Sequence, residues 1–290
     1  INDVPDFWKT RWLRKRPGIL GLEFGFPKLM GIINVTPDSF SDGGKHIELD
    51  AALNHAKLME RDGVDIIDIG GESTRPGASI VSILEEIERI EPVINGISIR
   101  SKIPISVDTR KSEVASAAHK AGASLVNDVS GFTFDPNLLA YCSEYNLPVC
   151  VMHMQGSPEN MQNNPKYENI LIEVYDFLEN QIGKLVQAGI SRDHIIADVG
   201  IGFGKNLGHN LTLIKNISLF HGLGVPLLLG VSRKSIISKL AKVEKPSDRL
   251  HGSISLAISA LGQGVQIFRV HDVAETKQAF DLWVAVNFGD

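Results

Sequence analysis

Short runs of apolar, mostly β-branched residues recur along the whole chain, and amphipathic segments separate them. Runs of this kind predict strands that are buried on both faces of a parallel sheet. Eight are present, at residues 30–35, 64–70, 104–107, 124–129, 148–154, 194–199, 226–231 and 265–270. The segments between them place apolar residues at helical spacing, as at Ile83, Ile87, Ile90 and Ile94. The pattern therefore predicts that strand and helix alternate from one end of the chain to the other.

Eight strand and helix units in 290 residues fit an α/β fold with a single (β/α)8 barrel, a TIM barrel. A doubly wound sheet usually has fewer strands, and a glycine fingerprint follows its first strand. We predict one barrel domain over residues 29–288 and a short N-terminal extension over residues 1–28. Two connections, at residues 198–211 and 232–250, are long for a barrel. They predict a binding loop and an additional helix, respectively.

A polar or charged side chain lies at or just beyond the end of each predicted strand. These residues are Asn34, Asp68, Asp108, Asn127, His153, Asp198, Ser232, Lys234, Arg269 and His271. In a barrel such ends meet at one mouth, where barrel active sites lie. The exception is His153, which stands between two methionines, a setting that favours a packed histidine over a ligand.

Composition and charge favour a small-molecule partner. The net charge is −5 and the sequence pI is near 6.0, so the chain lacks the basic field of a nucleic-acid-binding protein. No apolar run approaches the roughly 20 residues of a membrane-spanning helix. The two cysteines, Cys142 and Cys150, have neither disulfide-framework nor zinc-finger spacing. Their spacing indicates a reducing, cytoplasmic compartment.

Two loops carry groups suited to a metal ion and to phosphate. Asn34 ends the first strand and offers a neutral oxygen to Mg²⁺, and residues 36–44 add hydroxyls, carboxylates and glycines. We predict that this segment, with Asp38, covers the substrates when they bind. Residues 70–77 form a glycine-rich loop in which Arg75 is suited to bidentate phosphate binding. An ordinary surface turn is the alternative for each loop.

The interior of the barrel is predicted to hold Asp108, Asn127 and Asp198. Buried carboxylates need donors, so either a flat nitrogen heterocycle or a network within the protein must satisfy them. The sequence leaves both possibilities open. The glycine-rich loop after Asp198 matches neither nucleotide-binding motif, and no histidine or cysteine pattern supports zinc. Magnesium is therefore the predicted metal. Phe203 is a candidate wall for an aromatic substrate, or a packed residue.

Taken in order, seven motifs make the chain resemble the dihydropteroate synthases. They lie at residues 34–44, 70–77, 106–109, 127–131, 198–205, 232–235 and 269–272. The resemblance implies a folate-pathway transferase that joins (7,8-dihydropterin-6-yl)methyl diphosphate to 4-aminobenzoate, giving 7,8-dihydropteroate and diphosphate. It also implies a homodimer and sensitivity to sulfonamides.

Matching motif positions implies roles for single residues. The pterin would be bound by Asp108, Asn127, Val129, Met152 or its neighbour Met154, Asp198 and Lys234. The 4-aminobenzoate would be bound by Thr74, Arg75, Pro76, Phe203, Lys234 and Ser235. The diphosphate would be bound by Asn34, Arg75, Arg269 and His271, with Asn34 also contacting Mg²⁺. Catalytic roles would fall to Asp38, Arg75, Asp198 and Lys234.

Charge placement favours an SN1-like reaction in which diphosphate leaves before the arylamine attacks. One position departs from the family pattern: Val199 stands where proline usually follows the pterin-binding aspartate, which leaves the backbone freer. Two alternatives to the synthase are a pterin-dependent methyltransferase, which needs no diphosphate site, and a catalytically silent pterin-binding paralogue.

Overall fold

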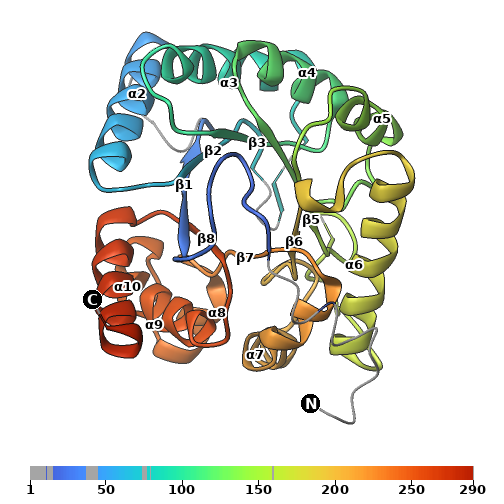
Figure 1. Cartoon of the computed structure of the whole chain (residues 1–290), viewed down its shortest axis with the longest axis vertical. Helices are drawn as coiled ribbons and strands as arrows, with labels where there is room; N and C mark the ends of the chain where they lie inside the picture. The colour runs from blue at the N-terminus through green and yellow to red at the C-terminus, as the bar shows by residue number, and fades with distance from the viewer. Residues whose placement is uncertain are drawn as a thin grey trace.

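The computed structural model describes residues 11, 16–36, 45–73, 77–78, 80–158 and 160–289. Its centre is a closed barrel of eight parallel strands in sequence order (Figure 1). The strands are β1 Lys28–Asn34, β2 Ile66–Gly70, β3 Ile105–Asp108, β4 Leu125–Asp128, β5 Val149–Met152, β6 Ile195–Asp198, β7 Leu227–Leu229 and β8 Ile267–Val270. Each overlaps the apolar run that predicts it, so the barrel prediction is confirmed.

Helices surround the barrel, and most of its apolar core lies between them and the strands (Figure 1). They are α2 Lys45–Arg61, α3 Ile83–Ser98, α4 Ser112–Ala121, α5 Pro136–Glu144, α6 Ile170–Gln187, α7 Leu207–Lys215, α8 Ser235–Ala241, α9 Leu250–Leu261 and α10 Val273–Phe288. Short 3-10 helices occur at η2 Arg192–His194, η3 Ile217–Leu223 and η4 Pro246–Arg249. The additional helix predicted after the seventh strand is α8.

Local sequence explains where several helices begin. The side chain of Asp135 accepts a hydrogen bond from the backbone of Asn137 at the start of α5, and Pro136 occupies the first helical position. Asn206 and His209 form a reciprocal capping box at the start of α7. These caps fix the points at which the loops beyond the strands turn into helices.

The interior of the barrel is layered. Successive side chains of a strand alternate between its two faces, so every second one points inward. One inner layer is apolar and consists of Met30, Ile66, Leu125, Cys150, Ile196, Leu228 and Ile267. Two positions further along five of these strands stand Asp68, Asn127, Met152, Asp198 and Arg269. The site residues therefore form the next layer, towards the carboxyl ends of the strands.

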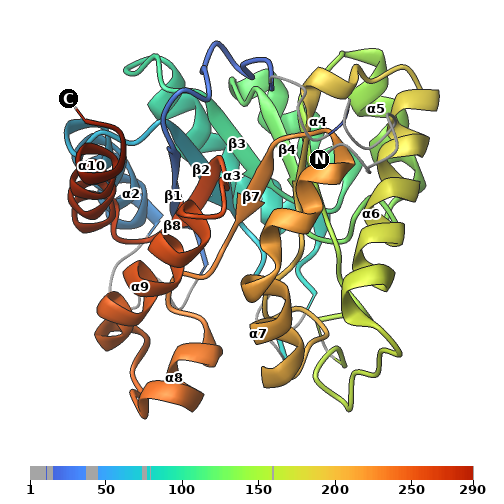
Figure 2. The same cartoon turned by 60° about the horizontal axis from the view of Figure 1, so that its bottom comes forward.

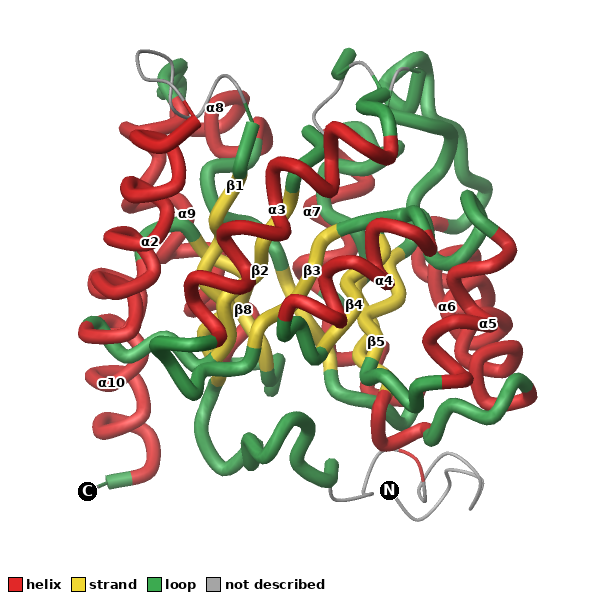
Figure 3. The backbone as a smooth tube through the Cα atoms, turned by 90° about the horizontal axis from the view of Figure 1, so that it is seen from above, coloured by secondary structure: helices red, strands yellow, loops and turns green. Residues whose placement is uncertain are grey.

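Residues 16–28 cover the opposite end of the barrel. Ile19 is buried against the apolar inner layer, and Leu22 and Phe24 pack partly against it. Ile19 and Leu22 exchange backbone hydrogen bonds of 3.0 and 2.8 Å, which make a tight turn. This segment lies at one end of the barrel and α8 lies at the other (Figure 2; Figure 3). The polar layer is thus the one closer to α8.

Two predictions from composition can be compared with the structure. Cys142 and Cys150 are both buried free thiols, and burial raises the pKa of Cys142 to about 12. Both act as small apolar residues. Among the described residues, we find no helix with the length and apolar character that crossing a membrane requires.

Candidate active site

The guanidinium of Arg269 lies between two buried carboxylates. Its Nε donates to Oδ2 of Asp68 over 2.6 Å, and its Nη2 donates to Oδ2 of Asp108 over 2.8 Å. Burial opposes the charge on Arg269, but the two carboxylates outweigh burial and raise its pKa further above the ordinary value. Burial also raises the pKa of Asp108, and Arg269 opposes that rise. The guanidinium on β8 and the carboxylates on β2 and β3 therefore stabilise one another in their charged forms.

Asn127 completes this group. Its amide nitrogen donates to Oδ2 of Asp68 over 3.3 Å, and the strand register places it beside Asp108. Of the described residues, none donates to Oδ1 of Asp108. A protein network thus satisfies Asp68, whereas Asp108 keeps one carboxylate oxygen for a donor from a ligand.

Asp198 ends β6 on the other side of the barrel. Its Oδ1 accepts a hydrogen bond from the backbone of Gly200 over 2.8 Å, and its backbone oxygen accepts one from His153 over 3.0 Å. Burial raises the pKa of Asp198, and the Gly200 bond opposes the rise most, followed by Lys234 and Lys205. Val199 is 1% exposed and packs in the core. These bonds hold the backbone on both sides of Val199.

Lys234 connects the interior carboxylate with an aromatic side chain. It occupies the N-cap position of α8, and its Nζ lies 4.1 Å from the centroid of the Phe203 ring. That distance permits a cation–π interaction. Burial lowers the pKa of Lys234 to about 8, and the charge of Asp198 opposes this shift. Asp198, Lys234 and Phe203 thus form a second group, which Arg269 influences electrostatically.

The remaining predicted residues take different positions. Val129 and Met152 are buried, Asn34 is half-buried at the end of β1, and Ser235 is exposed at the start of α8. His271 is half-buried, and its Nδ1 lies 2.9 Å from the hydroxyl of Ser232. Four predicted residues lie outside the described residues: Asp38, Thr74, Arg75 and Pro76.

His153 is a packed histidine, as predicted. It is 6% exposed, and its ring meets that of Phe177 edge to face with centroids 5.0 Å apart. Burial lowers the pKa of His153 to about 2. The ring is therefore neutral near neutral pH.

A buried ionic network beside the mouth was not predicted from the sequence. Nζ of Lys111 donates to Oε1 of Glu72 over 3.0 Å, to Oε2 of Glu86 over 2.7 Å and to the backbone oxygen of Val81 over 2.6 Å. Nη2 of Arg110 donates to Oε2 of Glu72 over 2.7 Å. The network ties the loops after β2 and β3 to α3.

One signal in the sequence points to this network. Glu86 follows Ile83 by three positions and precedes Ile90 by four, so it lies on the apolar face of α3. A carboxylate there requires a buried cation. Lys111, which closely follows β3, supplies that cation, and the adjacent Arg110 pairs with Glu72.

The donor set for a metal ion is small. Within the described residues, no cluster of three histidine, cysteine, aspartate or glutamate side chains is placed to hold a metal. Asn34 makes no side-chain hydrogen bond with any other described residue and has its amide oxygen free for coordination. Mg²⁺ is often held by one or two protein oxygens together with substrate phosphates and water. Asn34 could therefore supply one oxygen to a magnesium ion whose other ligands are water and phosphate oxygens.

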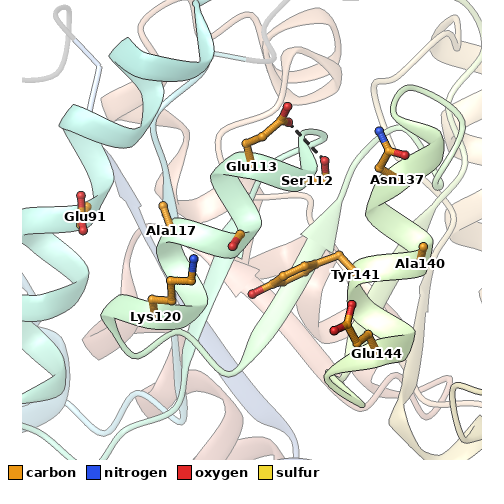
Figure 4. Close-up of a pocket in the computed structure, with 10 residues that line it drawn as sticks. Glu91, Ser112, Glu113, Ala117, Lys120, Asn137, Ala140, Tyr141 and Glu144 are labelled. Atoms are coloured by element: carbon orange, nitrogen blue, oxygen red, sulfur yellow. Dashed lines mark hydrogen bonds between the residues drawn. The ribbon is translucent and has the colours of Figure 1, made fainter.

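A separate hollow lies between α4 and α5 on the outside of the barrel (Figure 4). Among the residues that line it are Glu113, Lys120, Asn137 and Tyr141. None of the strand-end residues takes part, so the candidate active site is the polar layer at the mouth.

Comparisons with known proteins agree with this geometry. The chain matches the family of pterin binding enzymes over residues 30–271. It is 49% identical to the dihydropteroate synthase of Escherichia coli K12 over 258 residues, which cover 89% of this chain and 91% of that relative.

Two solved structures are also similar. Yersinia pestis dihydropteroate synthase, solved with a sulfonamide drug complex, has a TM-score of 0.87 and 46% identity, covering 91% of this chain and 96% of that one. Xanthomonas albilineans dihydropteroate synthase, solved with 4-aminobenzoic acid, has a TM-score of 0.87 and 42% identity, covering 92% and 95%. With the strand-end carboxylates, cations and amide in place, the chain belongs to the dihydropteroate synthases, within the pterin-binding enzymes.

Proposed function

We propose that this chain catalyses the condensation of (7,8-dihydropterin-6-yl)methyl diphosphate with 4-aminobenzoate, giving 7,8-dihydropteroate and diphosphate. One observation carries the proposal. Asp108 and Asp198 each keep a carboxylate oxygen that no described residue bonds, and Arg269 and Lys234 lie beside them. A ring rich in N–H groups with an anionic substituent matches both parts of that arrangement.

The pterin ring is proposed to lie between the two carboxylate groups. Asp108 and Asp198 accept its N–H groups, and Asn127 has both a donor and an acceptor for the ring edge. Lys234 donates to the ring carbonyl, while Val129 and Met152 line the apolar side of the pocket. Partial burial strengthens these hydrogen bonds because little water competes for the same groups.

The diphosphate is proposed to meet Arg269, His271 and Asn34. Arg269 uses Nε and Nη2 for the carboxylates, which leaves Nη1 to donate to an anion. The hydroxyl of Ser232 holds the ring of His271 in place. When Mg²⁺ is bound with the substrate, it neutralises charge on the diphosphate oxygens. Arg75 adds a cation by family resemblance.

The 4-aminobenzoate is proposed to lie against Phe203 and Lys234, with Ser235 at the start of α8. Phe203 offers an aromatic face, and Lys234 holds positive charge over that ring. Thr74, Arg75 and Pro76 complete this subsite by family resemblance. The arylamine then approaches the methylene carbon from the mouth of the barrel.

The reaction is proposed to be SN1-like. Donors from Arg269 and His271 stabilise the charge that develops on the departing diphosphate. The carboxylate of Asp198 stabilises the positive charge left on the pterin methylene, and Asp38 is proposed to act with it. The weakly nucleophilic amine attacks afterwards. Full activity of Asp198→Asn or Arg269→Ala would contradict this course.

Three further properties are proposed from the resemblance: a homodimer, a cytoplasmic location and inhibition by sulfonamides. The sulfonamide complex of the Yersinia pestis relative supports inhibition by sulfonamides. Light scattering of the purified chain measures whether it is a dimer. A dose-dependent fall in turnover on adding a sulfonamide, relieved by excess 4-aminobenzoate, tests inhibition.

The test of function is turnover by the purified chain. We expect diphosphate release that requires the pterin diphosphate, 4-aminobenzoate and Mg²⁺ together. Pterin binding without diphosphate release would contradict the synthase and leave a silent paralogue or a methyltransferase. The similar relatives are dihydropteroate synthases, which favours the synthase over the methyltransferase.

A further inference from the structure

Lys205 is a buried lysine for which the proposed reaction has no use. It is 2% exposed, and its Nζ lies 2.8 Å from Nδ1 of His153. The same nitrogen donates to the backbone oxygens of Phe203 over 2.9 Å and of His153 over 3.2 Å. Three neutral acceptors thus surround the ammonium, and none of them is a carboxylate. Burying a charge in this way is costly, so the position requires an explanation.

The bonds of Lys205 cross a tight seam between two segments. A Cβ at Gly200 would lie 1.9 Å from the backbone oxygen of His153, and one at Gly204 would lie 2.3 Å from that of Gln155. Both glycines have positive φ angles, 70° and 62°. The loop after β6 therefore lies directly against the chain that follows β5. Lys205 is the side chain that joins the two segments through hydrogen bonds to His153.

The position of Lys205 also affects the pterin-binding carboxylate. Its charge lowers the pKa of Asp198, which burial raises. From the other elements, Lys234 beyond β7, Arg269 on β8 and the thiol of Cys150 on β5 also interact with Asp198. In the proposed reaction Lys234 and Arg269 contact substrate, whereas Lys205 does not.

In the hydrogen bond between Lys205 and His153, the shared proton belongs to the lysine. Burial, with a smaller contribution from Lys205, lowers the pKa of His153 to about 2, so the ring accepts at Nδ1. Burial lowers the pKa of Lys205 to about 7, and the charge of Asp198 opposes that shift. Protonated Lys205 therefore donates to all three of its acceptors.

We propose that Lys205 is a positioning residue of the pterin site: its hydrogen bonds to His153 and Phe203 hold a buried positive charge beside the Asp198 loop, where that charge favours the ionised form of Asp198. The inference rests on the proposed function in one respect, namely that Asp198 accepts hydrogen bonds from the pterin. Lys205 itself touches no substrate.

The decisive experiment compares pterin binding by the full chain and by Lys205→Met as a function of pH. Methionine keeps the length and removes the charge. The probe is 6-hydroxymethylpterin, which lacks the leaving group, and its affinity is measured by calorimetry. Binding weakens as Asp198 becomes protonated. For Lys205→Met we expect the midpoint of that loss to lie about one pH unit higher than in the unmodified chain. Below both midpoints the variant should bind the pterin about tenfold more weakly than the unmodified chain, and above both midpoints the two affinities should be similar.

A purely structural role predicts a different result. Loss of packing lowers affinity by the same factor at every pH and leaves the midpoint unchanged. The matched control is Tyr167→Phe, which removes the 2.7 Å bond from the tyrosine hydroxyl to the oxygen of Gly204 without changing charge in the loop. We expect its midpoint to match that of the unmodified chain. Coincident midpoints for Lys205→Met and the unmodified chain would overturn the proposal.

Lys205→Gln provides a second variant, since it keeps a donor for one carbonyl without the charge. If neither variant folds, carbon-13 NMR of the unmodified chain decides the matter, with labels on the aspartate carboxyl carbons and the lysine Cε carbons. An Asp198 carboxyl resonance that shifts at the pH where Lys205 loses its proton supports the proposal, and an Asp198 resonance that does not respond to Lys205 overturns it. Failure of the unmodified chain to bind the pterin would refute the proposed function, whereas the response of Asp198 to Lys205 would still test the role of Lys205.

Discussion

The guanidinium of Arg269 donates to the carboxylate of Asp68 over 2.6 Å, although the two residues are 201 positions apart in the sequence. Strands β2 and β8 both pair with β1, which brings their inward side chains together. The side chain of Asp68 is fully buried and that of Arg269 is 21% exposed. A carboxylate this deep needs a permanent cation, so Arg269 supports the fold as well as the proposed anion site.

Replacing Arg269 by methionine is therefore expected to lower both stability and turnover. It leaves Asp68 and Asp108 without their cation, at a cost of about 3 kcal/mol in the free energy of unfolding at pH 7. The loss should shrink at lower pH, because burial raises the pKa of Asp108 and its protonation removes one of the uncompensated charges. Urea unfolding at pH 7 and at a lower pH measures the difference. A loss that is the same at both values would show that packing, not charge, is responsible.

Replacing Lys111 by methionine tests the buried network beside the mouth. Glu86 and Glu72 would lose a bonded cation in a position where water cannot replace it. We expect a loss of about 3 kcal/mol in unfolding free energy. Lys277→Met is the control, since its pair with Asp281 is exposed and contributes less than about 0.5 kcal/mol. Similar losses for the two variants would contradict a structural role for the network.

The pH dependence of stability should reveal His153. Its pKa in the folded chain is about 2, below the ordinary value of 6.5. Below pH 6.5 the unfolded chain thus binds a proton that the folded chain does not, so stability falls as pH decreases. His153→Asn, whose amide oxygen replaces Nδ1 as acceptor, should show a slope smaller by about 1.4 kcal/mol per pH unit between about pH 6 and pH 5. Equal slopes in urea unfolding would refute the assignment.

Gly200→Ala tests the close approach of the loop to the strand end. The added methyl group would meet the backbone oxygen of His153, and alanine is strained at a φ of 70°. We expect a loss of at least about 1 kcal/mol in stability, together with weaker pterin binding, because Asp198 is displaced. Calorimetry and thermal unfolding measure the two effects.

The matched control is Gly208→Ala in α7, where the nearest atom to the new Cβ lies 3.5 Å away. Stability there should be unchanged or slightly higher, since alanine is the better helix former. Equal losses at both positions would mean that the contact with His153 is not responsible.

Much of the site could be predicted from local sequence. Asp108, Asn127 and Asp198 lie at or near the ends of apolar runs, and alternation along a strand places such residues inside the barrel. His153 could be identified as a packed residue from its two methionine neighbours. Val199 predicts a freer backbone after Asp198, and in the structure Asp198 accepts hydrogen bonds from the backbone N–H groups of Gly200 and His153. The roles of the predicted site residues all stay predictions, and Asp38 and Arg75 also lie outside the described residues.

The ionic partners could not be predicted in this way. The sequence predicts that Arg269 binds diphosphate, whereas what the structure shows is its pairing with Asp68 and Asp108. Lys205 appeared only as the end of a glycine-rich motif, and nothing in the sequence indicates that it meets His153, which lies 52 positions earlier. Such pairs depend on which strands become neighbours and in which register.

The sequence by itself determined the order of strands and helices, the barrel, and the set of polar residues at its mouth, because each is encoded within a few consecutive residues. Only the tertiary structure decided how the buried charges are paired. Arg269 with Asp68 and Asp108, Lys111 with Glu86, and Lys205 with His153 all join separate segments. Closing the barrel removes these groups from water, and each charge must then take its partner from whichever segment the fold places beside it.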